Sequence, residues 1–149
     1  RSTLFPYTTL FRSALAQLFQ GRQLARCSTQ ESIAQHIMMI VTSHYGEVVS
    51  REDYGSAIWE LEFHQLVRAD VWEDEVSASL LATINKYEPR LKQIEVKVTL
   101  SEIEDYSHHS KVHIRRKADI TVKGQLVTNQ LPFYFTTAIY ISPLSQQQA

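Results

Sequence analysis

The sequence is poor in the residues that cross-links, metal sites and phosphate-binding loops require. Its single cysteine, Cys27, cannot form an internal disulfide or a cysteine-based zinc site. Four glycines in 149 residues leave little for a loop that cradles phosphate. No apolar run approaches the roughly 20 residues of a membrane helix, and 15 basic residues against 16 acidic ones lack the excess typical of nucleic-acid binders. We therefore expect a cytoplasmic protein that binds no nucleic acid and does not insert directly into a membrane.

Motifs of the common enzyme classes are missing as well. The sequence has no Gly-x-Ser-x-Gly, Walker, Gly-x-Gly-x-x-Gly or His-Glu-x-x-His motif. Among the six histidines, His109 and His113 are four residues apart, but in an extended chain this spacing keeps the two rings far apart. We expect no metal site, no cofactor and no small-molecule substrate.

The segment 47–75 is acidic, with nine carboxylates against two arginines. Glycosidases need two carboxylates about 5–10 Å apart, one of them with a raised pKa. The pairs Glu60 with Glu62 and Glu73 with Asp53 supply the residue types, but a charge run is usually a solvated face. We expect no catalytic residue and a protein that is not an enzyme, with a peptidoglycan-hydrolysing, lysozyme-like enzyme as the alternative.

The two ends of the chain differ from its middle. Residues 3–13 (Thr-Leu-Phe-Pro-Tyr-Thr-Thr-Leu-Phe-Arg-Ser) match, codon for codon, the in-frame translation of a common short-read sequencing adaptor. We therefore expect residues 1–13 to be non-native and the natural N-terminus to be unknown. Residues 14–27 are expected to form an N-terminal arm and residues 143–149 a C-terminal tail, which leaves 28–142 as one domain.

A first helix of about four turns is predicted directly after the arm. Ser28 and Glu31 form a capping-box pattern, in which each side chain satisfies a backbone N–H of the other residue. Gly46 stands where a glycine after the last turn would end the helix. The apolar face is expected to comprise Ile33, Ile37, Ile40 and Val41.

A short helix near 56–62 and a second long helix are predicted next. Asp70 is expected to cap the long helix, because Glu73 follows three residues later. Pro89 is expected to stop it, since a proline pushes the preceding residue out of the α region. The apolar face comprises Val76, Leu80, Leu81, Ile84 and Tyr87.

After residue 90 the apolar period changes from 3.6 to 2. This alternation predicts strands over 94–100, 111–123 and 133–141, with a polar loop over 101–110 and a turn that opens at Gly124. The sequence therefore predicts a single α+β domain, in which N-terminal helices are followed by an antiparallel sheet of about three strands.

Two features of the predicted strands stand apart from a plain half-buried sheet. Arg116 falls among the apolar positions of its strand, so either a β-bulge lies there or the guanidinium is buried with a partner. The last strand is apolar on both faces, with Tyr134 and Tyr140 on one of them. Such a strand is usually central in its sheet or covered by another element.

The tripeptide Glu88-Pro89-Arg90 lies at the predicted corner between helix and strand. A carboxylate and a guanidinium flank a residue of fixed φ, so the corner can present two opposite charges rigidly to another chain. The alternative is a helix stop with a local ion pair.

Residues 28–142 resemble the gene-25-like family of contractile-tail baseplate wedge proteins, which occur in contractile phages and, as TssE, in type VI secretion systems. The matching segments are 31–37 (Glu-Ser-Ile-Ala-Gln-His-Ile), 44–47 (His-Tyr-Gly-Glu), 53–55 (Asp-Tyr-Gly) and 87–91, which carries the Glu-Pro-Arg motif. Residues 25–28 and 57–60 look most like members from Bacteroidetes type VI systems. Residues 42–46 depart from the Asn-Thr-Arg-x-Gly end of the family's first helix, so no role of that arginine is carried over.

The resemblance implies a structural role in the cytoplasm, within a membrane-docked baseplate. The partners it implies are the other baseplate wedge subunits and the sheath proteins, whose first ring the sheet would template; a phage tail baseplate is the alternative setting. The Glu-Pro-Arg corner is expected to hold the wedge, so that Glu88→Ala and Arg90→Ala abolish assembly while the isolated domain stays folded. The expected interface residues are Glu88, Pro89, Arg90, Arg116, Tyr134 and Tyr140.

Overall fold

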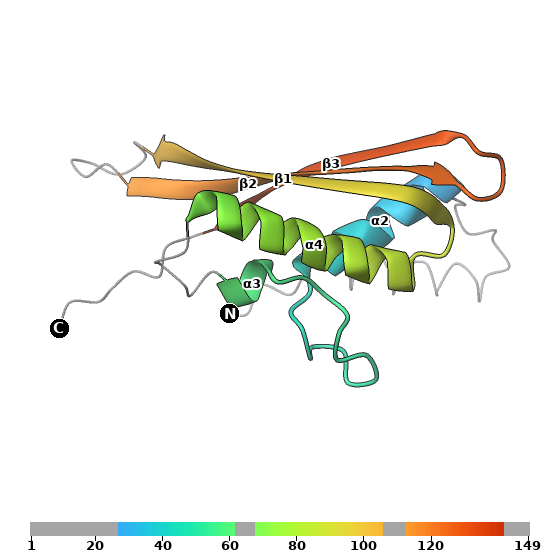
Figure 1. The fold of residues 1–149 in the computed structure, drawn as a ribbon, viewed down its shortest axis with the longest axis horizontal. Helices are drawn as coiled ribbons and strands as arrows, with labels where there is room; N and C mark the ends of the chain where they lie inside the picture. The colour runs from blue at the N-terminus through green and yellow to red at the C-terminus, as the bar shows by residue number, and fades with distance from the viewer. Residues whose placement is uncertain (1–26, 62–67, 106–112, 142–149) are drawn as a thin grey trace, which may run out of the picture.

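The computed structural model describes residues 27–61, 68–105 and 113–141. Within these residues, two long helices and a short one precede three strands, and the strands form one antiparallel sheet in the order β1-β2-β3. The helices lie on one face of the sheet (Figure 1). The predicted α+β architecture is therefore confirmed. The elements are α2 (Thr29–Thr42), α3 (Ile58–Leu61), α4 (Ala69–Tyr87), β1 (Leu91–Asp105), β2 (His113–Leu126) and β3 (Pro132–Ile141).

Helix α2 begins as its sequence predicts. The Ser28 hydroxyl accepts from the Glu31 N–H at 3.2 Å, and the Glu31 carboxylate accepts from the Ser28 N–H at 2.7 Å. The predicted end of the helix is wrong, because the chain turns extended already at Ser43, whose N–H still reaches the Met39 carbonyl. Gly46 lies beyond the helix in a turn, where its N–H donates to the Glu52 carbonyl.

Helix α3 falls within the predicted range of the short helix, and α4 ends one residue before Glu88, as the proline predicts. The predicted cap of α4 is wrong: the helix begins at Ala69, and Arg68 occupies the N-cap position without a side-chain cap. Asp70 lies inside the first turn and binds the Arg68 guanidinium through both carboxylate oxygens, at 3.1 and 2.7 Å.

The strands are longer than the alternation predicts. Residues 101–105, expected in a loop, continue β1 and pair with the start of β2. Gly124 does not open the turn, because β2 runs on to Leu126 opposite the beginning of β3. The pairing of β1 with β2 shifts between Lys92 and Glu95, where Gln93 has a φ of +52°.

Strand β3 is at the edge of the sheet that the described strands form, so the first of the two expectations, a central strand, is wrong. Phe133, Ile139 and Ile141 point to the helices and are buried. Tyr134 and Tyr140 point to the opposite face and are 64% and 59% exposed, so no described element covers that face. The apolar character of this outer face is therefore not explained by packing within the described chain.

The core lies between the helices and the inner face of the sheet. It joins the apolar side of α2, the loop before α3, the apolar side of α4 and alternate residues of all three strands. The largest fully buried apolar side chains are Ile33, Ile37, Ile40, Val41, Ile58, Val76, Leu80, Ile84, Ile120 and Val122.

Membrane-length helices and clusters of metal-binding side chains are both absent from the described residues. None of the described helices combines the length and the apolar character that crossing a membrane requires. Within the same residues, no three His, Cys, Asp or Glu side chains gather as metal ligands would. Residue 109 lies outside the described part of the chain.

Candidate functional site

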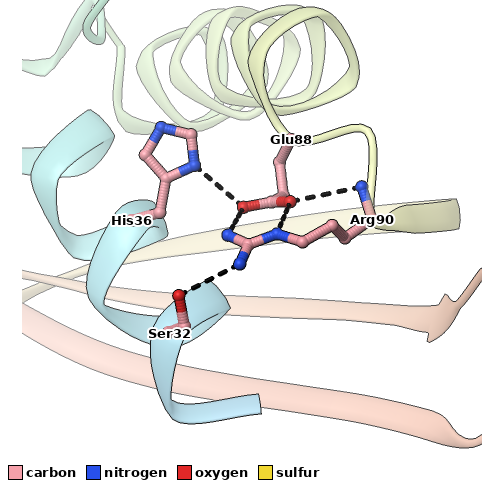
Figure 2. Close-up of polar contacts among 4 residues, drawn as sticks. All are labelled: Ser32, His36, Glu88 and Arg90. Atoms are coloured by element: carbon pink, nitrogen blue, oxygen red, sulfur yellow. Dashed lines mark hydrogen bonds and ion pairs between the residues drawn. The ribbon is translucent and has the colours of Figure 1, made fainter. Parts of the chain in front are cut away.

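The Glu-Pro-Arg corner joins the end of α4 to the start of β1. Glu88 is the C-cap of α4, and its N–H still donates to the Ile84 carbonyl at 2.8 Å. Pro89 lies in the turn that follows and is exposed, while Arg90 leads into β1. The turn aims the Glu88 side chain inward at α2, where it is only 1% exposed (Figure 2).

Both carboxylate oxygens of Glu88 are bound within the chain. Arg90 donates to Oε1 through Nε and to Oε2 through Nη2, each at 2.6 Å, and its backbone N–H reaches Oε1 at 3.2 Å. From α2, His36 contacts Oε2 through Nδ1 at 2.8 Å, and the Ser32 hydroxyl accepts from Arg90 Nη1 at 3.0 Å. These four residues, which we call the corner clasp, tie α2 to the helix-to-strand corner (Figure 2).

The chemistry of the clasp is that of a charged pair with a histidine donor. An ionised carboxylate only accepts hydrogen bonds, so Nδ1 of His36 carries the proton that faces Glu88. Burial alone would raise the pKa of the Glu88 carboxyl, but hydrogen bonds from Arg90 and His36 outweigh it and hold this pKa below its usual value. The hydrogen bonds to Glu88 in turn raise the pKa of Arg90. Glu88 and Arg90 therefore stay charged at neutral pH.

A second layer supports the clasp from the loop before α3. The His36 ring stacks on Tyr54 with a centroid distance of 5.9 Å, and Tyr54 meets the edge of Tyr87 at 5.2 Å. Asp53 accepts from the Lys86 ammonium and the Tyr87 hydroxyl, and these bonds hold the pKa of the Asp53 carboxyl below its usual value. Asp53 and Tyr54 of the Asp-Tyr-Gly step thus pack against the last turn of α4, just before the corner, and against His36 of the clasp.

The family model of the baseplate wedge protein gp25 matches residues 27–130. This span covers well over half of the sequence and contains both long helices, the corner and the first two strands. The chain belongs to this family. This baseplate wedge protein is therefore a structural component of a baseplate, where it assembles with other baseplate subunits.

Two solved structures share the fold of the wedge protein. A candidate tail lysozyme from Geobacter sulfurreducens is 18% identical, with a TM-score of 0.56 over 80% of this chain and 97% of that one. A chain of the baseplate complex from the type VI secretion system is 19% identical, with a TM-score of 0.50 over 75% and 93%. No curated protein matches the sequence.

The corner differs from the expected one in what it offers a partner. The sequence leaves open whether the corner presents both charges to another chain or is a helix stop with a local ion pair. The structure shows the local ion pair, in which Glu88 is buried and fully engaged by the wedge protein's own residues. Ser32 and His36 were not predicted from the sequence as partners of the corner. They lie four residues apart on one face of α2, but nothing local indicates which side chain they meet.

The other expected interface residues lie away from the corner. Arg116 has no β-bulge, because the register of β2 runs on unbroken through it, and its guanidinium is half exposed and 3.6 Å from Glu102. Both predictions for Arg116, a β-bulge or a buried guanidinium, are therefore wrong. Arg116 lies on the same face of β2 as the buried Ala118 and Ile120, but its own side chain is outside the core and exposed. Tyr134 and Tyr140 lie on the outer face of β3.

The clasp makes the stability of the wedge protein depend on pH in the acid range. Because the folded-state pKa of Glu88 is lowered, its contribution is complete above the ordinary value of 4.5 and is lost as the pH falls below it. Glu31 and Asp53 titrate in the same direction, so Glu88→Gln isolates the effect. We expect urea unfolding from pH 7 to pH 3 to show a shallower loss of stability in Glu88→Gln than in the wild type. Parallel curves would contradict this prediction.

Proposed function

We propose that this wedge protein is a subunit of a type VI secretion baseplate, which joins the other wedge subunits and templates the first ring of the sheath. The observation that carries the proposal is the family match over residues 27–130, together with the pre-formed clasp at its Glu-Pro-Arg corner. The fold shared with the type VI baseplate structure, and the sequence's likeness to Bacteroidetes members, support this setting over a phage tail. The baseplate would dock to the membrane from the cytoplasm.

Arg90 and Pro89 form the part of the corner that a wedge partner would contact. Arg90 is 38% exposed and uses Nε, Nη1 and Nη2 within the chain. A guanidinium has five N–H groups, so Nη1 and Nη2 each keep one for a partner's carbonyl or carboxylate oxygen. Glu88 contributes to the interface by holding the guanidinium in place, beside the rigid and exposed Pro89.

The outer edge and face of β3 are the surface that a sheath subunit would use. The strand is ten residues long with an unbroken register to β2, and an extended segment from a neighbour can add to such an edge. Tyr134 and Tyr140 offer two exposed rings on the face next to that edge. Arg116 pairs with Ile141 in the register and therefore lies on the other, helix-facing side of the sheet, where its half-exposed guanidinium would be a separate contact.

We propose further that the wedge protein is not an enzyme. Asp53 is bound to Lys86 near the end of α4, whereas Glu73 lies in the second turn of the same helix. Glu73 and Lys86 are 13 positions apart on this helix, which is about 20 Å at 1.5 Å per residue, well beyond the separation of a glycosidase pair. Glu62 lies outside the described residues, so the pair of Glu60 with Glu62 stays a sequence-based alternative.

Capture of neighbouring baseplate proteins tests the proposal. We expect the wild-type chain to capture the wedge subunits encoded beside it, and Arg90→Ala to reduce capture more than tenfold, because a partly buried charge contact across an interface contributes about 2–5 kcal/mol. Arg90→Lys keeps the charge but loses the fork of donors and should also weaken capture. Arg68→Ala, whose side chain is exposed at the start of α4, is the matched control.

The outcomes separate the role of the corner from that of the whole chain. Undiminished capture by Arg90→Ala, with its folding checked by circular dichroism, would show that the corner is not the contact. If the wild type captures neither wedge nor sheath proteins, the proposed function fails, and a peptidoglycan-hydrolysis assay tests the lysozyme-like alternative.

A further inference from the structure

The two edges of the sheet are built differently. Among the strands of the described residues, in the order β1-β2-β3, both β1 and β3 have one side without a strand neighbour. Unpaired edge strands expose a row of backbone donors and acceptors on which another strand can be added. Which of the two edge strands accepts an added strand therefore depends on which edge is blocked and which is free.

A side chain from α4 closes the edge of β1. Glu73 Oε1 accepts from the backbone N–H of Leu100 at 2.6 Å, the length of a charge-assisted hydrogen bond. Since β1 pairs with β2 on its other side, this N–H is one that an added strand would need. In β1, the residues two positions before and after Leu100 point their N–H groups to the same side of the strand. The Glu73 carboxylate therefore lies in the middle of the row of N–H groups along this edge.

The beginning of β1 is also unsuited to strand addition. The register shift between Lys92 and Glu95, with Gln93 at a φ of +52°, interrupts the regular ladder at this end. A bulge of this kind twists an edge strand and disrupts the spacing that a new strand has to match. The bulge and the Glu73 carboxylate together leave β1 without a continuous free edge.

Strand β3 has neither feature. Its register to β2 runs unbroken from Pro132 to Ile141. Among the described residues, no side chain hydrogen-bonds to the outward backbone groups of β3; Thr137 contacts Met38 only through its own hydroxyl, at 3.6 Å. The two edges thus differ in regularity and in side-chain protection.

We propose that the Glu73 carboxylate protects the β1 edge by occupying the Leu100 N–H, and we call this contact the guard of the edge. The guard confines strand addition to β3 and keeps the chain from pairing through β1 with a second copy of itself. The proposal rests on the proposed function only for the identity of the strand that β3 receives. The guard itself acts in the isolated chain, because the carboxylate has to leave the Leu100 N–H before another backbone carbonyl can take its place.

Three variants of the full chain test the guard. Glu73→Ala removes the acceptor, Glu73→Gln keeps an acceptor oxygen without the charge, and Glu75→Ala removes the same charge from an exposed position two residues along α4. We expect light scattering at rising protein concentration to show Glu73→Ala reaching about twice the mean mass of the wild type, as a second copy pairs through β1. Glu73→Gln and Glu75→Ala should follow the wild type.

Hydrogen exchange identifies the site of the change. In dilute Glu73→Ala, we expect the Leu100 amide to exchange about tenfold faster than in the wild type, while the amide of Ile37 in the core of α2 keeps its rate. The proposal would be overturned if Glu73→Ala had the same mean mass as the wild type. It would also be overturned if Glu75→Ala associated as strongly as Glu73→Ala. Because no baseplate partner takes part, failure here is distinct from failure of the capture experiment.

Discussion

Replacement of Gly55 by alanine is expected to destabilise the domain by about 4 kcal/mol. Gly55 has a φ of +135°, which side chains other than hydrogen do not tolerate. A Cβ at this position would lie 2.6 Å from the Ser43 carbonyl oxygen and 3.0 Å from backbone atoms of His44. Strain and overpacking each cost about 1–3 kcal/mol.

The close approach at Gly55 exists because the loop seals the end of α2. The Val41 carbonyl accepts from the Ser56 hydroxyl and the Trp59 indole, both at 3.1 Å, and the Ser43 carbonyl accepts from the Ser56 N–H at 3.1 Å. These are carbonyls that the helix itself leaves unpaired. A side chain on Gly55 would push the loop away and break the bonds together.

Gly46 provides the matched control. It too has a positive φ, +76°, but a Cβ there would have no neighbour within 4 Å. We expect Gly46→Ala to cost only about 1 kcal/mol, the strain of the left-handed conformation alone. Urea unfolding of both variants measures the difference, and equal losses would show that backbone crowding at Gly55 is not the cause.

Replacement of Glu88 by alanine is expected to cost about 3 kcal/mol. It removes the carboxylate from between Arg90 and His36, both of which are partly buried. Breaking a buried ion pair costs about 3–5 kcal/mol when the remaining charge stays buried, and the partial exposure of Arg90 places this case at the lower end. The expectation that Glu88→Ala leaves the isolated domain unaffected is therefore revised, because Glu88 binds inside the domain.

Thermal and urea unfolding of the isolated chain check the prediction for Glu88. Glu95→Ala is the control, because Glu95 is exposed on β1 and its loss should change stability by less than about 0.5 kcal/mol. A wild-type melting midpoint in Glu88→Ala would contradict the internal role of the carboxylate. If Arg90→Lys weakens partner capture while the free energy of unfolding stays close to the wild-type value, Arg90 itself lies at the interface.

Local sequence patterns predicted those elements whose signals are complete within a few residues. The capping box fixes the start of α2, and Pro89 fixes the end of α4, because both act on backbone groups of their immediate neighbours. The alternation of apolar residues correctly placed three strands. Their ends were predicted less well, since Gly124 and residues 101–105 take their conformation from pairing with the opposite strand.

The candidate site was predicted in position but not in contacts. The sequence singled out Glu88, Pro89 and Arg90 as a rigid charged corner, and the fold places them at such a corner. It did not predict that the carboxylate faces α2, because His36 is 52 residues away along the chain. The resemblance supplied the family, which the match over residues 27–130 confirms.

By itself, the sequence determined the order of the elements, the corner and the family, since each depends on residues that lie close together in the chain. The tertiary structure decided which charge of the corner is buried, which strand lies at the edge and which edge carries a guard. The Glu73 contact with Leu100 and the Glu88 contact with His36 join residues 27 and 52 positions apart. Contacts of that range form only when α4, α2 and the sheet pack together, and no local pattern specifies them.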